Sequence, residues 1–299
     1  MNPLQYCNIV YIFMGVIMGL ATMSFWGVGI FLSAIANRKF ENVIVLFWMQ
    51  FFGLLLGIAY FVYGFSSFNL NSVIEYLPQL VIIAILQIMA YLSFYKGLTK
   101  GQVSMVSSIG ASWGLLTAIL GVIFLHETLR FNQVLAIILI ALGIVFVSVN
   151  LKELFANKKI KLLIGVKEGL IAMACWGVAL FMLASLTKVI GWFLPAFIFR
   201  IFLLVFLAAF VLFSKKSFIP AKAKFPWQIL LFIGLFDMAA FFTFSLGTSG
   251  SFASIVAPIG SAYALVTIIL AKIFLKEKIK INQYFGIAGI LAGLILISL

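Results

Sequence analysis

The sequence predicts an all-α polytopic membrane protein of ten transmembrane helices, built as two inverted five-helix repeats. Three observations predict this fold class. Of the 299 residues, 65% are hydrophobic and only 9% are charged, whereas a soluble domain carries about 45–50% apolar and about 25% charged residues. The apolar residues form runs of about twenty, the length of helix that crosses roughly 30 Å of hydrocarbon. The second half of the sequence also repeats the first at an offset of 150 residues.

Charged residues and turn residues separate the apolar runs from one another. Cutting the sequence there gives ten predicted spans, at 10–35, 43–64, 77–97, 102–124, 131–150, 165–187, 193–213, 227–247, 251–273 and 281–299. The first run is too long for the core of a signal peptide and has no small-residue cleavage site after it, so we interpret it as the first span. The only long connector, 151–161, divides the chain into a first repeat, 1–150, and a second repeat, 151–299.

The internal repeat is clearest between 94–148 and 244–298, where twenty of fifty-five ungapped positions are identical. The matched positions there include glycines and turn residues, and near the start of each half Trp26 and Gly27 match Trp176 and Gly177. Such residues recur by chance much less often than leucine or isoleucine. The decapeptides FLHETLRFNQ and FLKEKIKINQ, at 124–133 and 274–283, occupy the same place in each repeat. They predict a connector between the fourth and fifth helix, in which Glu127 and Glu277 precede an apolar helix and favour its positive N-terminal end.

Each repeat has five spans, an odd number, so the second repeat is expected to enter the membrane from the opposite side to the first. Many secondary transporters use such inverted repeats around a site at the bilayer midplane. Lysine and arginine gather in the loops that follow odd-numbered spans, at Arg38, Lys39, Lys96, Lys100, Lys152, Lys158, Lys159, Lys161, Lys215, Lys216, Lys222, Lys224, Lys276, Lys278 and Lys280. The other side has little beyond Arg130 and Lys188. Because cytoplasmic loops carry the excess of lysine and arginine, we expect a protein of the cytoplasmic membrane with both termini outside and 151–161 in the cytoplasm.

Enzyme chemistry, metal binding and nucleic-acid binding are not expected. A zincin helix needs a second histidine four residues after the first, but His126 is the only histidine in the chain, and Cys7 and Cys175 are isolated. The net charge of +13 lies in short clusters beside apolar runs, which is typical of membrane-flanking residues and not of a nucleic-acid surface. No phosphate-binding loop is present, so transport driven directly by ATP within this chain is excluded. No cofactor is expected.

The segment YKGLTKGQVSMVSSIGASWGLLTAILGVIFLHETLRFNQ, which begins at residue 95, and its second copy SLGTSGSFASIVAPIGSAYALVTIILAKIFLKEKIKINQ resemble the drug/metabolite transporter superfamily, in its ten-helix EamA-like family. The resemblance covers nearly the whole chain. It implies a secondary carrier of small metabolites, often amino acids, with a central cavity lined by the first, third, fourth, sixth, eighth and ninth helices. The family pattern often has arginine early in helices two and seven and proline in helices four and nine. The second half supplies Arg200 and Pro258, while the first half has Gln50 and Ser108 at these places.

Polar residues deep inside the spans are costly in a bilayer and therefore point to function. Asp237 lies near the middle of its span, and its equivalent in the first repeat is Gln87. Two interpretations of Asp237 stay open. It could bind a substrate ammonium group or a coupling proton, or it could form a structural buried ion pair with Arg200, which lies at a compatible depth.

Aromatic residues near the predicted midplane complete the candidate substrate site. Tyr91 and Phe241 each follow Gln87 or Asp237 by four residues, so each pair shares one helix face. The candidate substrate-binding residues are Trp26, Gln87, Tyr91, Trp113, Trp176, Asp237, Phe241 and Tyr263. In a chain with 16% aromatic residues, any one of them could equally be packing.

The expected function is secondary transport by alternating access of a small polar metabolite, with amino acids and related compounds as the first class. A nucleobase, nucleoside or sugar carrier of the same fold is the alternative, because aromatic side chains at the midplane could stack on a planar ring. A lipid flippase or membrane scaffold is the alternative from another class, and it would have no need of Asp237. The expected partners are a small-molecule substrate and the lipid bilayer, and a homodimer is left open.

Overall fold

The computed structural model describes residues 3–101, 103–148, 164–219, 226–276 and 281–297. Within these ranges the chain is helical and contains no strand. The helices are α1 (Pro3–Asn37), α2 (Asn42–Tyr63), the 3-10 turn η1 (Phe65–Ser67), α3 (Asn71–Ile74), α4 (Leu77–Lys100), α5 (Val103–Ala111), α6 (Trp113–Phe124), α7 (Phe131–Ser148), α9 (Val166–Ile190), α10 (Phe193–Phe213), α11 (Trp227–Gly250), α12 (Ala253–Ser261), α13 (Tyr263–Phe274) and α14 (Ile281–Ile297). The long connector 151–161 lies outside the described residues.

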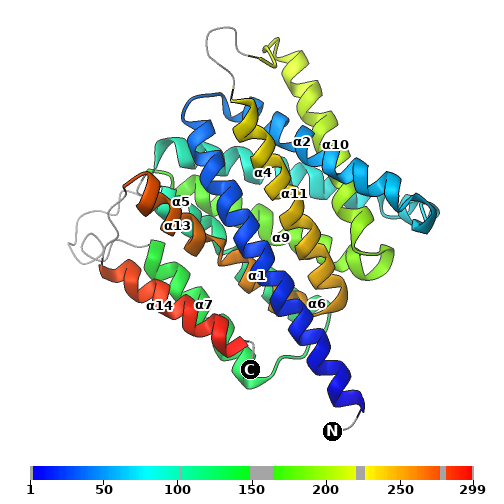
Figure 1. Cartoon of the computed structure of the whole chain (residues 1–299), viewed down its shortest axis with the longest axis vertical. Coiled ribbons are helices and arrows are strands. Elements are labelled where there is room, and N and C mark those ends of the chain that lie inside the picture. Colours follow the sequence, from blue (N-terminus) through cyan, green and yellow to red (C-terminus); the bar gives the residue numbers. More distant parts are fainter. Residues whose placement is uncertain (1–2, 102, 149–163, 220–225, 277–280, 298–299) are drawn as a thin grey trace.

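Helices from the two halves of the sequence pack against each other throughout the bundle. The most extensive contacts join α1 to α11, α4 to α9, and α7 to α14. Figure 1 shows α7 and α14 side by side at one edge of the molecule, while α1, α4, α9 and α11 lie at its centre. Neither half therefore forms a core of its own, and the central helices bury residues of both halves against one another.

Seven stretches within the described residues are long and apolar enough to cross a membrane, and the three remaining predicted spans contain shorter apolar helices. The long ones are Ile12–Asn37, Asn42–Tyr63, Leu77–Lys100, Val166–Ile190, Phe193–Phe213, Trp227–Gly250 and Ala253–Phe274. The shorter ones are Ile109–Phe124, Phe131–Gly143 and Tyr284–Ile297. The protein is therefore an all-helical, multi-pass membrane protein, and every predicted span coincides with helix.

The predicted fourth and ninth spans each consist of two helices separated by a single residue. The breaks lie at Ser112 and Ala262, which are equivalent positions of the two halves. At both breaks the backbone tightens, because the N–H of Ser112 bonds to the carbonyl of Ile109 (3.1 Å), and that of Ala262 is shared between the carbonyls of Ile259 (3.1 Å) and Pro258 (3.2 Å). Such i→i−3 turns interrupt the α-helical ladder. The residue after each break, Trp113 or Tyr263, begins the next helix.

The two halves exchange equivalent hydrogen bonds. Thr117 Oγ1 donates to the carbonyl of Gly177 (2.9 Å), and Thr267 Oγ1 donates to the carbonyl of Gly27 (3.1 Å). Thr267 is equivalent to Thr117 and Gly27 to Gly177, at the offset of 150 residues. The first half therefore donates in one bond and accepts in the other. An approximate twofold relation between the halves produces this exchange.

The connector glutamate was expected to lie at the N-terminus of the helix that follows it, and this prediction is wrong for Glu127. Its carboxylate does not cap α7 but accepts hydrogen bonds from backbone N–H groups at the start of α12, in the other half. Glu277, its equivalent, lies outside the described residues. The connector of the first half thus contacts the second half directly.

Candidate functional site

A small central cavity of about 30 Å³ lies between helices of the two halves. Seven of the eight candidate substrate-binding residues line it, namely Trp26, Tyr91, Trp113, Trp176, Asp237, Phe241 and Tyr263. The other lining residues are Gly29, Ile30, Ser33, Met49, Tyr95, Leu180 and Ile233. The structure therefore brings together residues that lie up to about 240 positions apart in the sequence.

Asp237 is the charged residue in the wall of the cavity and is already held by two donors. Its Oδ1 accepts a hydrogen bond from the Tyr91 hydroxyl (2.6 Å), and its Oδ2 forms an ion pair with Arg200 Nη2 (2.6 Å). Only 5% of Asp237 is exposed. A carboxylate offers about four acceptor positions, so Asp237 can accept from a ligand while it keeps both protein partners. The ion-pair interpretation of Asp237 and its place in the cavity are thus compatible.

Arg200 lies behind this wall and does not line the cavity. It is fully buried, and its guanidinium stands 5.2 Å from the ring centroid of Phe241, at cation–π distance. A β-carbon on Gly53 would come within 2.5 Å of Arg200 Nη1, so glycine at this place makes room for the guanidinium. Arg200 therefore acts on the site through Asp237, whose carboxylate it neutralises and orients.

Gln87, the equivalent of Asp237, also lies behind the cavity wall. It is fully buried, and its Oε1 accepts a hydrogen bond from the indole N–H of Trp176 (2.9 Å). Trp176 packs edge-on against Tyr91, with ring centroids 5.3 Å apart. Gln87 thus fixes the orientation of a cavity residue and does not itself face the cavity.

An aromatic cluster around Trp26 forms another part of the cavity wall. Trp26 makes edge-to-face contacts with Trp113 and Phe241, at centroid distances of 5.5 and 5.2 Å. Phe244, one turn beyond Phe241, packs against both tryptophans at 5.9 Å. Edge-to-face contacts hold these rings in fixed positions, so the cavity has a rigid apolar wall.

Tyr263 brings a second polar group to the cavity. Its side chain is 1% exposed, and its hydroxyl has no hydrogen-bond partner within the described ranges. A buried hydroxyl without a partner costs free energy, and a ligand in the cavity can supply the missing bond. The helix break at Ala262 places Tyr263 at the first position of α13.

Sequence reasoning missed three polar or polarisable residues of the cavity, Ser33, Met49 and Tyr95. They contact one another, because the Tyr95 hydroxyl lies 3.2 Å from Ser33 Oγ and 2.9 Å from Met49 Sδ. A signal was present for two of them. Tyr95 follows Tyr91 by four residues and Ser33 follows Trp26 by seven, so each lies on a helix face already predicted to line the cavity.

Comparison with known proteins agrees with this architecture. An uncharacterized protein of Methanocaldococcus jannaschii is 29% identical over 138 residues, which are 45% of this chain and 96% of that protein. A solved crystal structure superposes on this chain with a TM-score of 0.71, covering 94% of this chain and 95% of the other. At 14% sequence identity, this similarity supports the fold and nothing further. Residues 13–149 and 163–299 each match the EamA-like transporter family. The matches cover nearly the whole chain in two repeats, and the chain therefore belongs to the EamA-like transporter family.

Proposed function

We propose that the protein is a secondary transporter that moves a small polar metabolite across the cytoplasmic membrane by alternating access, and that the central cavity binds the substrate. The observation that carries this proposal is a cavity between the two halves, with Asp237 in an otherwise largely aromatic and apolar wall. A charged residue at this depth is expensive and marks a substrate or ion pathway. The family is a transporter family, which implies that the protein is not an enzyme.

Amino acids and related zwitterions are the substrate class that fits the polar groups best. Asp237 has acceptor positions left for an ammonium group, and the Tyr263 hydroxyl is a donor suited to a carboxylate. The aromatic cluster around Trp26 would receive an apolar side chain. A planar heterocycle such as a nucleobase is the second candidate, because the ring faces of the cavity favour stacking.

Alternating access rests on the relation between the two halves. We propose ten spans in two inverted repeats, with 1–150 and 151–299 exchanging conformations between the outward-facing and inward-facing states. The exchanged bonds of Thr117 and Thr267 support such a relation.

A thermal-shift screen of the purified protein against a panel of amino acids, nucleosides and sugars tests the proposal. A ligand that binds only the folded state stabilises it by RT ln(1 + [L]/Kd), or about 2.7 kcal/mol at a hundredfold excess over Kd. We expect a zwitterionic amino acid to raise the Tm and to be taken up by proteoliposomes. A panel in which only nucleosides shift the Tm would favour the second candidate. A ligand equally accessible from both sides at once would contradict a carrier and indicate a channel.

A further inference from the structure

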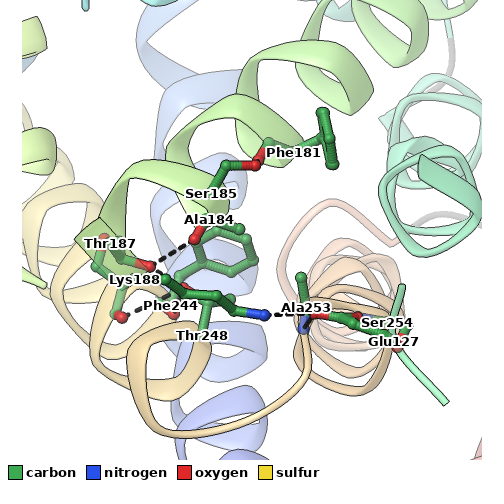
Figure 2. A network of polar contacts seen from close by, with 11 residues as sticks. Glu127, Phe181, Ala184, Ser185, Thr187, Lys188, Phe244, Thr248, Ala253 and Ser254 are labelled. Carbon is green, nitrogen blue, oxygen red and sulfur yellow. Dashed lines mark hydrogen bonds and ion pairs between the residues drawn. The ribbon is translucent and has the colours of Figure 1, made fainter. Parts of the chain in front are cut away.

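Glu127 forms the centre of a polar contact between three segments at one end of the bundle. Its Oε1 lies 2.7 Å from Lys188 Nζ, in the last turn of α9, and 2.9 Å from the backbone N of Ala253. Its Oε2 accepts from the backbone N of Ser254 at 2.8 Å. Figure 2 shows the three donors converging on the carboxylate. Because Glu127 belongs to the α6–α7 connector, this contact joins the first half to α9 and α12 of the second.

The carboxylate is buried, although a connector between helices is normally exposed. The Glu127 side chain is only 2% exposed, while that of Lys188 is 32% exposed. Burial by itself raises the pKa of Glu127, but the hydrogen bonds from Lys188, Ser254 and Ala253 together hold that pKa below its ordinary value. A glutamate held in this way is charged at neutral pH, so the contact is a charge-assisted one.

This contact lies beside a groove open to the surroundings, because Lys188 takes part in the contact and also lines the groove. The groove has a volume of about 590 Å³, and its lining residues include Lys188, Arg130, Gln133, Ser249 and Ser251. Two helices run from the cavity to the groove. On α9, Leu180 faces the cavity and Lys188 the groove, and on α11, Phe241 faces the cavity and Ser249 the groove.

Between the cavity-lining and groove-lining residues of these helices, packed side chains separate the two spaces. Thr187 and Thr248 join α9 to α11 at 3.2 Å between their hydroxyl oxygens. One turn nearer the cavity, Phe244 packs on Trp26 and Trp113 of the cavity wall. In the direction from cavity to groove, the path thus meets an aromatic ring, a threonine pair and the Glu127 contact.

We propose that Glu127, Lys188 and the N-terminus of α12 form a latch that closes the central cavity on the side where α1 begins. In the state described by the structure this latch is shut. Opening of the cavity to the groove requires Glu127 to leave its three donors, which frees α12 to move relative to α9. The proposal rests on the cavity being the substrate site of a transporter, but its test does not require a substrate.

Thiol labelling from each side of the membrane tests the latch. The reporter is Leu180→Cys in a Cys7→Ser/Cys175→Ser background, because Leu180 lines the cavity and takes no part in the latch. A membrane-impermeant methanethiosulfonate reagent is applied to right-side-out and to inside-out vesicles. We expect Glu127→Gln to increase the labelling rate from the α1-start side about tenfold, since a neutral amide holds the three donors more weakly than a carboxylate does.

Two further variants separate the latch from a general loosening. Lys188→Gln is expected to give a smaller increase in the labelling rate than Glu127→Gln. The double variant Glu127→Gln/Lys188→Gln should give no more than Glu127→Gln alone, because Lys188 acts in the latch through its interaction with Glu127. Glu41→Gln is the matched control. Glu41 pairs with Lys216 at the other end of α1 in an exposed ion pair, and its loss should leave the labelling rate unchanged.

An unchanged rate in both single variants, or an equal rise from both sides, would overturn the latch. If Glu127→Gln does not fold, Lys188→Gln decides by the same criterion. Loss of the proposed function has a different signature, namely no ligand-induced Tm shift and no uptake with the labelling pattern intact. The two failures can therefore be told apart.

Discussion

At the residue scale, the buried pair of Asp237 and Arg200 decides how the cavity can be tested. Arg200 has no exposed surface, and its Nε and Nη1 have no partner within the described part of the chain. Among the described residues, Asp237 alone forms an ion pair with Arg200. Removing one member of such a pair leaves a buried, uncompensated charge. This lowers the stability of the protein by much more than the intact pair contributes to it.

We expect Asp237→Asn to destabilise the protein by about 3–5 kcal/mol, because Arg200 is left buried and unpaired. Asp237→Asn/Arg200→Gln, which places uncharged amides at both positions as Gln87 and Gln50 do in the first half, should recover most of that stability. It should not recover uptake, because the acceptor for the substrate is lost. Thermal unfolding and proteoliposome uptake measure the two effects, with Glu41→Gln as an exposed ion-pair control that should change little. A fully stable, fully active Asp237→Asn protein would contradict both the pairing and the binding role.

The latch predicts a specific pH dependence of stability. The pKa of Glu127 is lower in the folded protein than its ordinary value of 4.5, so its stabilising contribution is complete above that pH and is lost as the pH falls through the lowered folded-state pKa. The charged groups near it are Lys188 of α9 and Arg130 of the groove, and α12 contributes backbone N–H groups. The Tm difference between wild type and Glu127→Gln should therefore be constant at neutral pH and shrink below about pH 4.5. A difference that persists unchanged under acid would argue against a charged latch.

Much of the cavity could be predicted at this scale, because helical spacing places residues four apart on one face. That rule put Tyr91 near Gln87 and Phe241 near Asp237, and both aromatics line the cavity. The rule could not tell that Gln87 lies behind Trp176, since this depends on the rotation of α4 against α9. Helical spacing also could not identify the backbone N–H of Ala253 as a donor to Glu127, because the two residues lie 126 positions apart in the sequence.

At the element scale, glycines set how closely the helices approach. A β-carbon on Gly53 of α2 would lie 2.5 Å from Arg200 Nη1 and 2.9 Å from the carbonyl oxygen of Gly234 on α11. A backbone oxygen cannot move aside without shifting its helix. The close contact of α2 with α11 therefore depends on glycine.

We expect Gly53→Ala to destabilise the protein by about 1–3 kcal/mol, the usual cost of overpacking, and to displace Arg200 from Asp237. Gly250→Ala is the control, because a β-carbon there meets no atom within 4 Å. Thermal unfolding of the two variants in detergent gives the comparison. Equal stability of both would show that α2 can shift without cost.

The sequence predicted where the helices lie but not that two of them are broken. Pro258 removes a backbone donor in the second half, but it lies inside α12, four residues before the break at Ala262. The first half has Ser108 at that place and is broken at the equivalent position all the same. The common cause is therefore not proline alone, and no residue type at 112 and 262 distinguishes a broken helix from a continuous one.

At the scale of the whole molecule, the charge pattern predicts the orientation in the membrane. A tag at the C-terminus should be accessible from outside the cell, and a tag in 151–161 only from inside, because the loops rich in lysine and arginine stay in the cytoplasm. Protease protection in intact cells and inverted vesicles provides the measurement. A cytoplasmic C-terminal tag would reverse the assignment and place the latch on the inner side.

The repeat was the most secure prediction from the sequence, because matched glycines and turn residues carry far more information than matched leucines. The two family matches, at 13–149 and 163–299, confirm two EamA-like units. The packing of those units against each other could not be deduced in the same way. It depends on contacts such as the hydrogen bond from Thr117 to Gly177, and neither residue type indicates from the sequence which residue it will contact.

Those exchanged threonine bonds have a consequence for biosynthesis. Gly27 is made early, yet the hydroxyl that bonds to its carbonyl belongs to Thr267, near the end of the chain. The carbonyl of Gly27 therefore has no such hydrogen-bond donor in the membrane until the ribosome has produced most of the second half. Two separately expressed halves should then find each other in the bilayer, as the products of two genes would, because each presents the groups that the other lacks.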